Sequence, residues 1–499
     1  MMNLRSSIEK HVTALLPEAF SPFLNRVFGT ATKFAGVQIV TFALGMVAGI
    51  INARLLGPYN FGIWMTATIV LAYLPFLNLG VDHGAYQEIP LLRGESRLDE
   101  AEKVKNVYFT FVLIMSALVS VSIIIFVSIY SLEFYIKWSL CVVALIGFIV
   151  SMGRWAHLML RANNQFVRSG LSESFDASAK LIAAPLVYFI GLPAIWIGSF
   201  IGSFSNAFYA WRSARFSPSV YWNSHILRRL IVFGFPIMLT SIAQILSTTG
   251  DRLLILAFLG TSDTGIYSLG RSITQILVIT GGVVGPVLYP LLTEHYGKTK
   301  DVASLRQFIK VPTVALGAVL PLIMGYVYFS IPVLFHWLLP AYESGISSAQ
   351  ILFWGVAIYQ VSGVSIYLLV ALNRQVLSFV LYSGGVCLGL ALEYLALNIG
   401  MSLLGVAIGS AVSNVVYTMV LVFLSLRFCK FDMKTQIRTT VFAVSPMFVL
   451  LVCCIFLDKI FVSSVGSGVW RDIVMFILKG TLVSIIVLPY SFLILKINK

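Results

Sequence analysis

Long uninterrupted apolar runs constrain the fold of this chain more than any other feature. Residues 106–130 and 402–426, for example, contain no charged side chain. A membrane-spanning helix needs about 20 mostly apolar residues, because each adds ~1.5 Å across a hydrocarbon core of ~30 Å. Runs of this length exclude a membrane β-barrel, whose strands alternate apolar and polar positions. The sequence therefore predicts an all-α integral membrane protein.

The composition agrees with this prediction. Hydrophobic residues make up 59% of the 499 positions and charged residues only 11%, whereas soluble domains carry about 25% charged residues. A chain with so few charges cannot cover itself with a surface that water solvates, so membrane lipid must surround it. The apolar runs predict fourteen transmembrane helices, at 31–53, 61–81, 106–130, 134–157, 171–190, 192–211, 230–259, 264–293, 309–338, 348–371, 376–397, 402–426, 440–460 and 470–495.

The distribution of Lys and Arg predicts the orientation in the membrane. When the connections are numbered alternately, 27 of the 34 basic residues fall on one side, Arg154 and Arg161 in the loop after the fourth span among them. Basic residues of short loops stay on the cytoplasmic side. We therefore expect a multi-pass protein of the plasma (inner) membrane with both termini in the cytoplasm. The net charge of +14 is then a topology signal and not a nucleic-acid-binding surface.

Motifs for catalysis or cofactor binding are missing from the sequence. It contains no phosphate-binding Gly-x4-Gly-Lys loop, no H-E-x-x-H zinc motif and no G-x-S-x-G nucleophile turn. The five cysteines lack metal or redox spacing, and the six histidines form no cluster. The N-terminus also lacks the short apolar core of a cleavable signal peptide. We expect no enzyme, no cofactor and no metal site.

One short pattern occurs twice and predicts an internal repeat. Residues 52–64 read NARLLGPYNFGIW and residues 255–267 read ILAFLGTSDTGIY; the two share L-G-x4-G-I and a final aromatic residue at an offset of 203 positions. A second pair, RANNQF at 161–166 and ALNRQV at 371–376, recurs in the same order. Six predicted spans separate the copies, so both run in the same direction through the membrane. Chance similarity between glycine turns is the other interpretation.

Parallel repeats of this kind are a transporter plan in which the substrate path lies between the halves. We therefore expect two parallel six-helix bundles followed by two extra C-terminal helices. The predicted boundaries are a cytoplasmic segment at 1–30, a first bundle at 31–229, a second bundle at 230–439 and the extra helix pair at 440–499.

Three stretches carry a resemblance to a known family. The segments ARLLGPYNFGIW, GDRLLILAFLGTSDTGIYSLGRS and LYPLLTEHYG resemble the polysaccharide transporter family, the O-antigen flippases of the multidrug/oligosaccharidyl-lipid/polysaccharide flippase superfamily. The resemblance extends over residues ~30–430 in the order of elements. It implies a pair of six-helix bundles that move lipid-linked sugars outward by alternating access.

Basic residues inside the spans are the candidate functional residues, because a charge at the centre of a membrane costs at least ~3 kcal/mol. Arg271 is the strongest candidate: it lies seven residues inside the eighth span, ~10 Å from its outer end. Tyr267, Thr274 and Gln275 share its helix face, which indicates a polar cavity. The alternative is a structural ion pair with Asp251.

The other candidates are weaker. Gln244 and Arg252 lie on one polar stripe of the seventh span, but Arg252 could simply neutralise the adjacent Asp251. Arg54 lies near the outer end of its span, where the side chain could extend to water. In its favour, NARLLG resembles an Ala-Arg-x-x-Gly stretch that lipid II flippases require, and Arg271 resembles their arginine on the eighth span. For Lys479, in the extra helix pair, extension to water or packing is the favoured interpretation.

Two functions remain open at this point. The first is a flippase for an anionic polyprenyl-pyrophosphate-linked oligosaccharide, with polysaccharide polymerases or glycosyltransferases as partners. Moving a pyrophosphate across the bilayer requires fixed cations, and arginine suits phosphate because of its planar donor fork. The second is a cation-coupled multidrug or small-molecule exporter, which would favour buried carboxylates. The sequence has few acids inside its spans, Asp251 and Glu393 among them, so the flippase is favoured.

Overall fold

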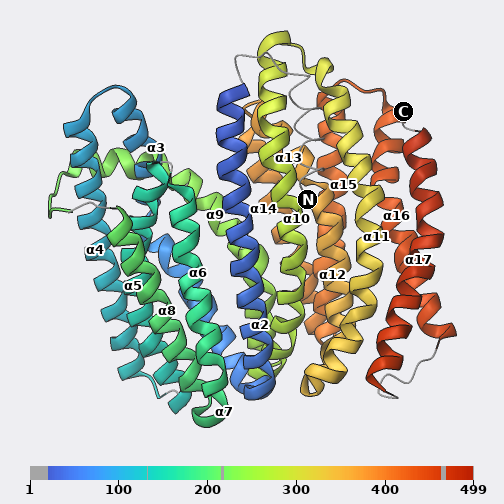
Figure 1. Cartoon of the computed structure of the whole chain (residues 1–499), viewed down its shortest axis with the longest axis horizontal. Helices are drawn as coiled ribbons and strands as arrows, with labels where there is room; N and C mark the ends of the chain where they lie inside the picture. The colour runs from blue at the N-terminus through green and yellow to red at the C-terminus, as the bar shows by residue number, and fades with distance from the viewer. Residues whose placement is uncertain (1–20, 132, 164, 215–217, 462–467, 498–499) are drawn as a thin grey trace. The chain divides into compact units, whose positions relative to one another are not determined.

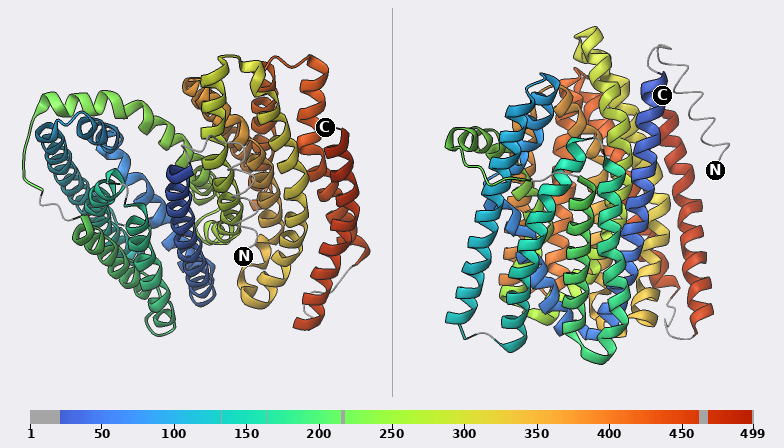
Figure 2. Two further views of the ribbon diagram at one scale, coloured as in Figure 1. Left: turned by 45° about the horizontal axis from the view of Figure 1, so that its top comes forward. Right: turned by 60° about the vertical axis from the view of Figure 1, so that its left-hand side comes forward.

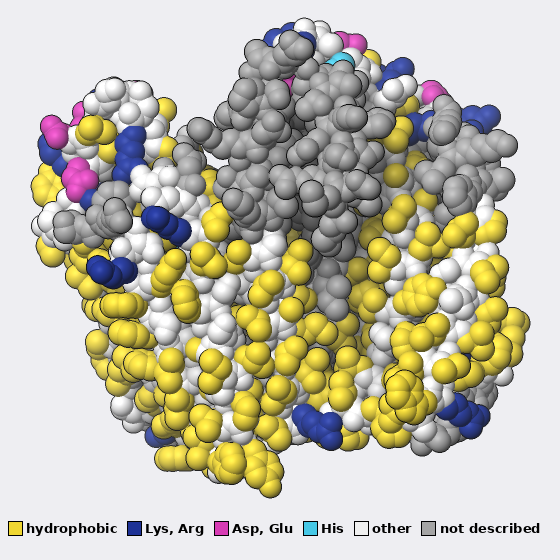
Figure 3. All heavy atoms as spheres, viewed as in Figure 1, with side chains coloured by type: hydrophobic (Ala, Val, Ile, Leu, Met, Phe, Trp, Pro, Cys, Tyr) yellow, Lys and Arg dark blue, Asp and Glu magenta, His cyan; other side chains and the backbone are white. Residues whose placement is uncertain are grey.

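The computed structural model describes residues 21–131, 133–163, 165–214, 218–461 and 468–497, and these form helices and short connections without a strand. Ten helical stretches of the described chain are long and apolar enough to cross a membrane. The prediction of an all-α membrane protein is confirmed, whereas the count of fourteen spans stays a prediction. On the face in Figure 3, hydrophobic side chains cover the length of the helices and charged ones lie mostly toward the helix ends.

The described helices group into two compact units that do not follow the chain order. One unit comprises Leu74–Pro236 and the chain before Asn52; the other comprises Asn52–Tyr73 and Ile237–Lys499. The long helix α2 (Ser21–Tyr73) is therefore divided between them, as is α9 (Ser224–Phe258). The predicted boundaries at 229/230 and 439/440 stay predictions.

The first unit contains the helices from α3 to α8, together with parts of α2 and α9. Within it, α4, α5, α6 and α8 run side by side (Figure 1). Its core is centred on Trp155 and Tyr108, both almost fully buried. The elements are η2 (Leu74–Asn78), α3 (Val81–Gly94), α4 (Leu98–Ile129), α5 (Phe134–Ala162), α6 (Phe166–Ala183), η3 (Ala184–Leu186), α7 (Val187–Ile190) and α8 (Leu192–Ala214).

The second unit contains the remaining helices. In it the C-terminal pair α16 and α17 lies alongside α11 (Figures 1 and 2). The Trp354 indole N–H, on α12, donates to the Met447 carbonyl oxygen of α16 at 2.9 Å. The elements are α10 (Thr261–Thr299), η4 (Val302–Leu305), α11 (Arg306–Leu338), η5 (Pro340–Gly345), α12 (Ile346–Val361), α13 (Gly363–Ala371), α14 (Gln375–Asn398), α15 (Leu403–Phe428), α16 (Met433–Ile460) and α17 (Val469–Ile497).

The two copies of the repeated pattern form matching turns within the second unit. The first glycine of each copy has a positive φ, 70° at Gly57 and 94° at Gly260, a conformation that glycine adopts without strain. The second glycine of each copy packs against the backbone of the other copy. A Cβ on Gly62 would lie 2.0 Å from the Thr261 carbonyl oxygen, and a Cβ on Gly265 would lie 2.1 Å from that of Pro58. The two copies therefore make a reciprocal contact, which we call the turn contact.

Candidate functional site

Arg271, the strongest sequence candidate, is buried between α10 and α9. Its Nη2 donates to the Ser247 carbonyl oxygen at 2.8 Å, and its Nη1 lies 3.7 Å from Asp251 Oδ2. Arg271 is 7% exposed and Asp251 3% exposed. The ion pair that the sequence left open as an alternative is therefore present. Within the described chain, Arg271 Nη1 and Asp251 Oδ2 are buried without a hydrogen bond. Each residue of the pair can therefore still bind another polar group.

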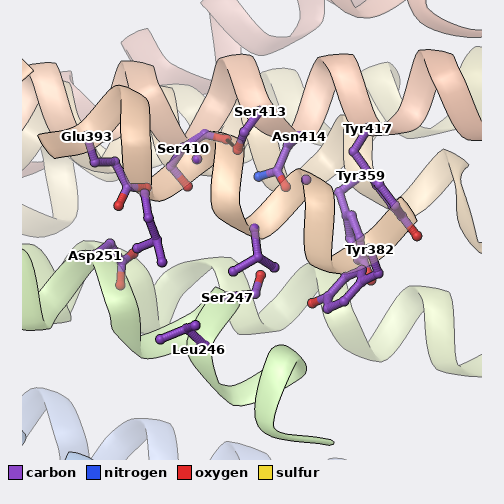
Figure 4. Close-up of a pocket in the computed structure, with 14 residues that line it drawn as sticks. Leu246, Ser247, Asp251, Tyr359, Tyr382, Glu393, Ser410, Ser413, Asn414 and Tyr417 are labelled. Carbon is purple, nitrogen blue, oxygen red and sulfur yellow. Dashed lines mark hydrogen bonds between the residues drawn. The ribbon is translucent and has the colours of Figure 1, made fainter. Parts of the chain in front are cut away.

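Asp251 also lines a narrow polar cavity among α9, α12, α14 and α15. Figure 4 shows Asp251 and Glu393 at one end of it, three tyrosines at the other, and polar side chains of α15 between them. Glu393 is 4% exposed, and its Oε2 has no hydrogen-bond partner among the described residues. The cavity measures about 30 Å³, and one water needs roughly 10–15 Å³. It can hold a water or a small cation but not a sugar.

The other sequence candidates make no direct bond to Arg271 among the described residues. Arg252 Nη2 donates to the Thr248 carbonyl oxygen at 2.9 Å, and its backbone N–H donates to Asp251 Oδ1 at 2.8 Å. Arg54 and Gln244 are exposed, and Gln275 is half-buried. Among the described residues, none of these four forms a hydrogen bond or ion pair with Arg271. Their shared role in a cationic cavity therefore stays a prediction.

Lys479 does not extend to water, as one interpretation suggested. It is 6% exposed, and its Nζ lies 2.7 Å from Asp458 Oδ1 and 5.5 Å from the centre of the Phe329 ring. Packing, the other interpretation, is what the structure shows. The pair borders a cavity of about 290 Å³ among α11, α12, α16 and α17.

A much larger cavity lies within the first unit, at residues that the sequence did not single out as a site. It measures about 550 Å³ and is bordered by α3, α4, α5, α6 and α8. Small-molecule sites typically measure ~300–1,000 Å³. Ten of its fourteen lining residues are polar: Asp82, His83, Tyr86, Tyr108, Arg154, His157, Arg161, Glu173, Ser203 and Asn206.

Arg154 and Arg161 border this cavity although they were assigned to a cytoplasmic loop. The predicted fourth span ends at 157, after Arg154 and before Arg161; α5 continues to Ala162, so both arginines are helical. Their spacing of seven residues, with His157 between them, places all three on one helix face. That periodicity was the signal that could have indicated a polar face.

Comparison with solved structures identifies the fold as that of membrane transporters. A MATE-family multidrug resistance transporter of the MOP superfamily, in an inward-facing conformation, is 15% identical with a TM-score of 0.66, over 80% of this chain and 95% of that one. The lipid II flippase MurJ, in an inward closed conformation, is also 15% identical with a TM-score of 0.66, over 91% of this chain and 97% of that one. An outward-facing MATE-family structure gives 14% identity and 0.58, over 83% and 96%.

Sequence comparison then places the chain in a family. Residues 51–339 match the family described as polysaccharide biosynthesis protein. No curated protein sequence matches the chain significantly. The chain belongs to the polysaccharide biosynthesis protein family, and the resemblance seen in its sequence is confirmed.

Proposed function

We propose that this protein is a flippase for a polyprenyl-pyrophosphate-linked oligosaccharide. It moves the repeat unit from the cytoplasmic to the outer leaflet of the plasma membrane by alternating access, for biosynthesis of a cell-surface polysaccharide such as an O-antigen or an exopolysaccharide. The observation that carries the proposal is membership of the polysaccharide biosynthesis family in a chain whose fold is similar to the lipid II flippase over 91% of its length. Glycosyltransferases would supply the substrate, and a polymerase would consume it.

The anionic headgroup gives the buried arginine a role. A pyrophosphate that leaves water needs charge-assisted hydrogen bonds, which a guanidinium supplies through two parallel donors. Among the described residues, Arg271 Nη1 has no hydrogen-bond partner, and it lies 3.7 Å from Asp251 Oδ2. In the proposed cycle the pyrophosphate competes with Asp251 for Arg271, while Arg54, Arg252, Gln244 and Gln275 contribute further donors to the path. Asp251 then requires another counter-charge, a proton or a cation, which would couple transport to an ion gradient.

A deletion strain tests the proposed function. Loss of the gene should abolish the surface polysaccharide and cause its lipid-linked precursor to accumulate on the cytoplasmic leaflet, and the intact gene on a plasmid should reverse both effects. Thin-layer chromatography of extracted lipids, combined with an impermeant sugar-modifying enzyme on intact spheroplasts, measures the amount and the leaflet. A strain that keeps its polysaccharide, or that lacks the precursor altogether, contradicts the proposal.

A second function has one observation in its favour. Asp251 and Glu393 line the same narrow cavity, and a pair of buried carboxylates is suited to bind a proton or a metal cation. This arrangement favours a cation-coupled multidrug exporter, and it also fits a cation-coupled flippase. The deletion strain separates the two: increased susceptibility to cationic dyes with normal polysaccharide would favour the exporter.

A further inference from the structure

The large cavity of the first unit is lined in part by charged and polar side chains that have no bonding partner in the described chain. Arg154, Asp82 and His83 border it, and within the described residues none of their side chains forms a hydrogen bond or an ion pair. Tyr86, on the same helix as Asp82, leaves 47% of its surface exposed. Charged and aromatic groups left open around a cavity of about 550 Å³ are typical of a binding site.

Several other residues that line this cavity are held in place by hydrogen bonds and an ion pair. Arg161 Nη2 lies 3.0 Å from Glu173 Oε1, and Gln38 Nε2 donates to the other carboxylate oxygen of Glu173 at 2.7 Å. The His157 ring joins Ser169 Oγ at 2.9 Å to Asn206 Oδ1 at 2.8 Å. These bonds connect α2, α5, α6 and α8, so these residues keep their geometry before any ligand arrives. Pre-organisation of this kind lowers the entropy cost of binding.

The charges of the cavity favour a polar ligand without strong net charge. Arg154 and Arg161 are balanced by Asp82 and Glu173. A pyrophosphate would meet two carboxylates here. Sugar hydroxyls, by contrast, both donate and accept hydrogen bonds, and the apolar face of a pyranose ring packs on an aromatic ring. The open ring of Tyr86 supplies such a surface.

The cavity also lies toward one end of its helices. Arg93, at the end of α3, bonds to Asn163, at the end of α5, so these two ends are adjacent. Arg154 precedes the last residue of α5 by eight positions, or ~12 Å along the helix. Under the predicted orientation this is the cytoplasmic end, where the lipid-linked sugar would be collected.

We propose that this cavity binds the sugar part of the lipid-linked oligosaccharide. The inference rests on the proposed function and assigns its sugar subsite. Arg154 and Asp82 contact sugar hydroxyls, Tyr86 packs against a sugar ring, and the hydrogen-bonded residues His157, Arg161 and Glu173 fix the position of the sugar.

Binding measurements on the full chain in lipid nanodiscs test this subsite. The probes are the lipid-linked oligosaccharide extracted from a polymerase-deficient strain of the source organism and sugar-free polyprenyl pyrophosphate, each radiolabelled. We expect the wild type to bind the sugar-bearing lipid more tightly. Arg154→Ala should lose about tenfold or more of this preference, as expected for one or two charge-assisted hydrogen bonds. Tyr86→Ala should lose part of it because the ring contact is missing, and both variants should bind sugar-free lipid normally. Arg168→Ala is the matched control, because Arg168 is exposed on the next helix and does not line the cavity.

Each outcome decides between the hypotheses. If the wild type shows no preference, or if Arg154→Ala and Tyr86→Ala both keep it, the sugar subsite is wrong while the flippase proposal stands. If the wild type binds neither lipid, the proposed function itself fails. If Arg154→Ala binds neither lipid, Arg154→Gln takes its place, because it keeps more of the side-chain volume. Loss of both lipids in that variant as well would assign Arg154 to folding and overturn the subsite.

Discussion

Arg271 is both a candidate functional charge and a member of a buried ion pair, whereas the sequence offered these two roles as alternatives. Its depth within the eighth span and its polar helix face indicated a functional charge, and the structure places it beside Asp251. Removing one partner of a buried ion pair typically costs ~3–5 kcal/mol, because the other charge is left uncompensated. A loss of function at Arg271 can therefore come from misfolding, and the test must separate folding from transport.

For this residue we predict that Arg271→Ala abolishes surface polysaccharide, and that Arg271→Lys restores it only in part because lysine lacks the two-pronged donor geometry. The double variant Arg271→Ala with Asp251→Asn removes both charges. If Arg271→Ala lowers the amount of protein in the membrane, the double variant should restore that amount to the wild-type level while polysaccharide stays absent. Immunoblots of membrane fractions and polysaccharide gels measure the two effects. Recovery of polysaccharide in the double variant would make Arg271 a structural residue, and full activity of Arg271→Ala would end its assignment as an anion site.

Arg154 shows what sequence reasoning misses at this scale. An arginine within a few residues of a predicted span end fits a cytoplasmic loop, because its long side chain can extend to the interface. The structure keeps Arg154 within α5, as the predicted span did, and shows in addition that it borders a cavity. Neighbouring helices define the cavity, so a one-dimensional count of charges cannot distinguish a lining residue from a topology signal.

The helices show which patterns translate directly into structure. The pairs Gly385-x3-Gly389 and Gly405-x3-Gly409 predict close helix contact, and the structure places Gly385 and Gly389 against Tyr417 and Ser413, and Gly409 against Glu393. At Gly45 and Gly49, which have the same spacing, nothing in the described chain lies within 4 Å of a Cβ, so a contact there stays a prediction. Spacing gives the face of a helix but not its neighbour.

The turn contact gives a prediction about these elements. Gly62→Ala and Gly265→Ala should each destabilise the protein, because the new methyl would lie about 2 Å from a backbone oxygen of the other turn and overpacking typically costs ~1–3 kcal/mol. Thermal unfolding in detergent should show a Tm lowered by several degrees for both. Gly45→Ala is the control and should keep the wild-type Tm or raise it slightly, because no atom of the described chain lies within 4 Å of a Cβ there. Two variants as stable as the wild type would mean that the turns do not pack this closely.

At the scale of the whole molecule, the apolar runs predict the helical fold, but they do not predict how the chain is shared between units. Residues 52–73 belong to the compact unit of the second half, although they precede most of the first. Sequence order cannot reveal this, because the assignment depends on packing around Pro58 and Gly62.

The predicted orientation places both turns on the extracytoplasmic side. We expect single cysteines at Asn60→Cys and Asp263→Cys to react with an impermeant maleimide in spheroplasts, and Lys298→Cys to react only after lysis. The background should lack the exposed thiols of Cys141 and Cys387. Labelling of one turn from outside and the other only after lysis would refute the parallel repeat.

The turn contact also has the symmetry of a subunit interface. In a two-fold dimer, residue i of one subunit meets residue j of the other, and j meets i. Gly62 against Thr261 and Gly265 against Pro58 reproduce this relation within one chain. The two turns are thus each other's binding partner, and a bulkier residue in one can be accommodated only by a change in the other. Arg54 and its equivalent Ala257 are both exposed, so that position is free to differ between the halves.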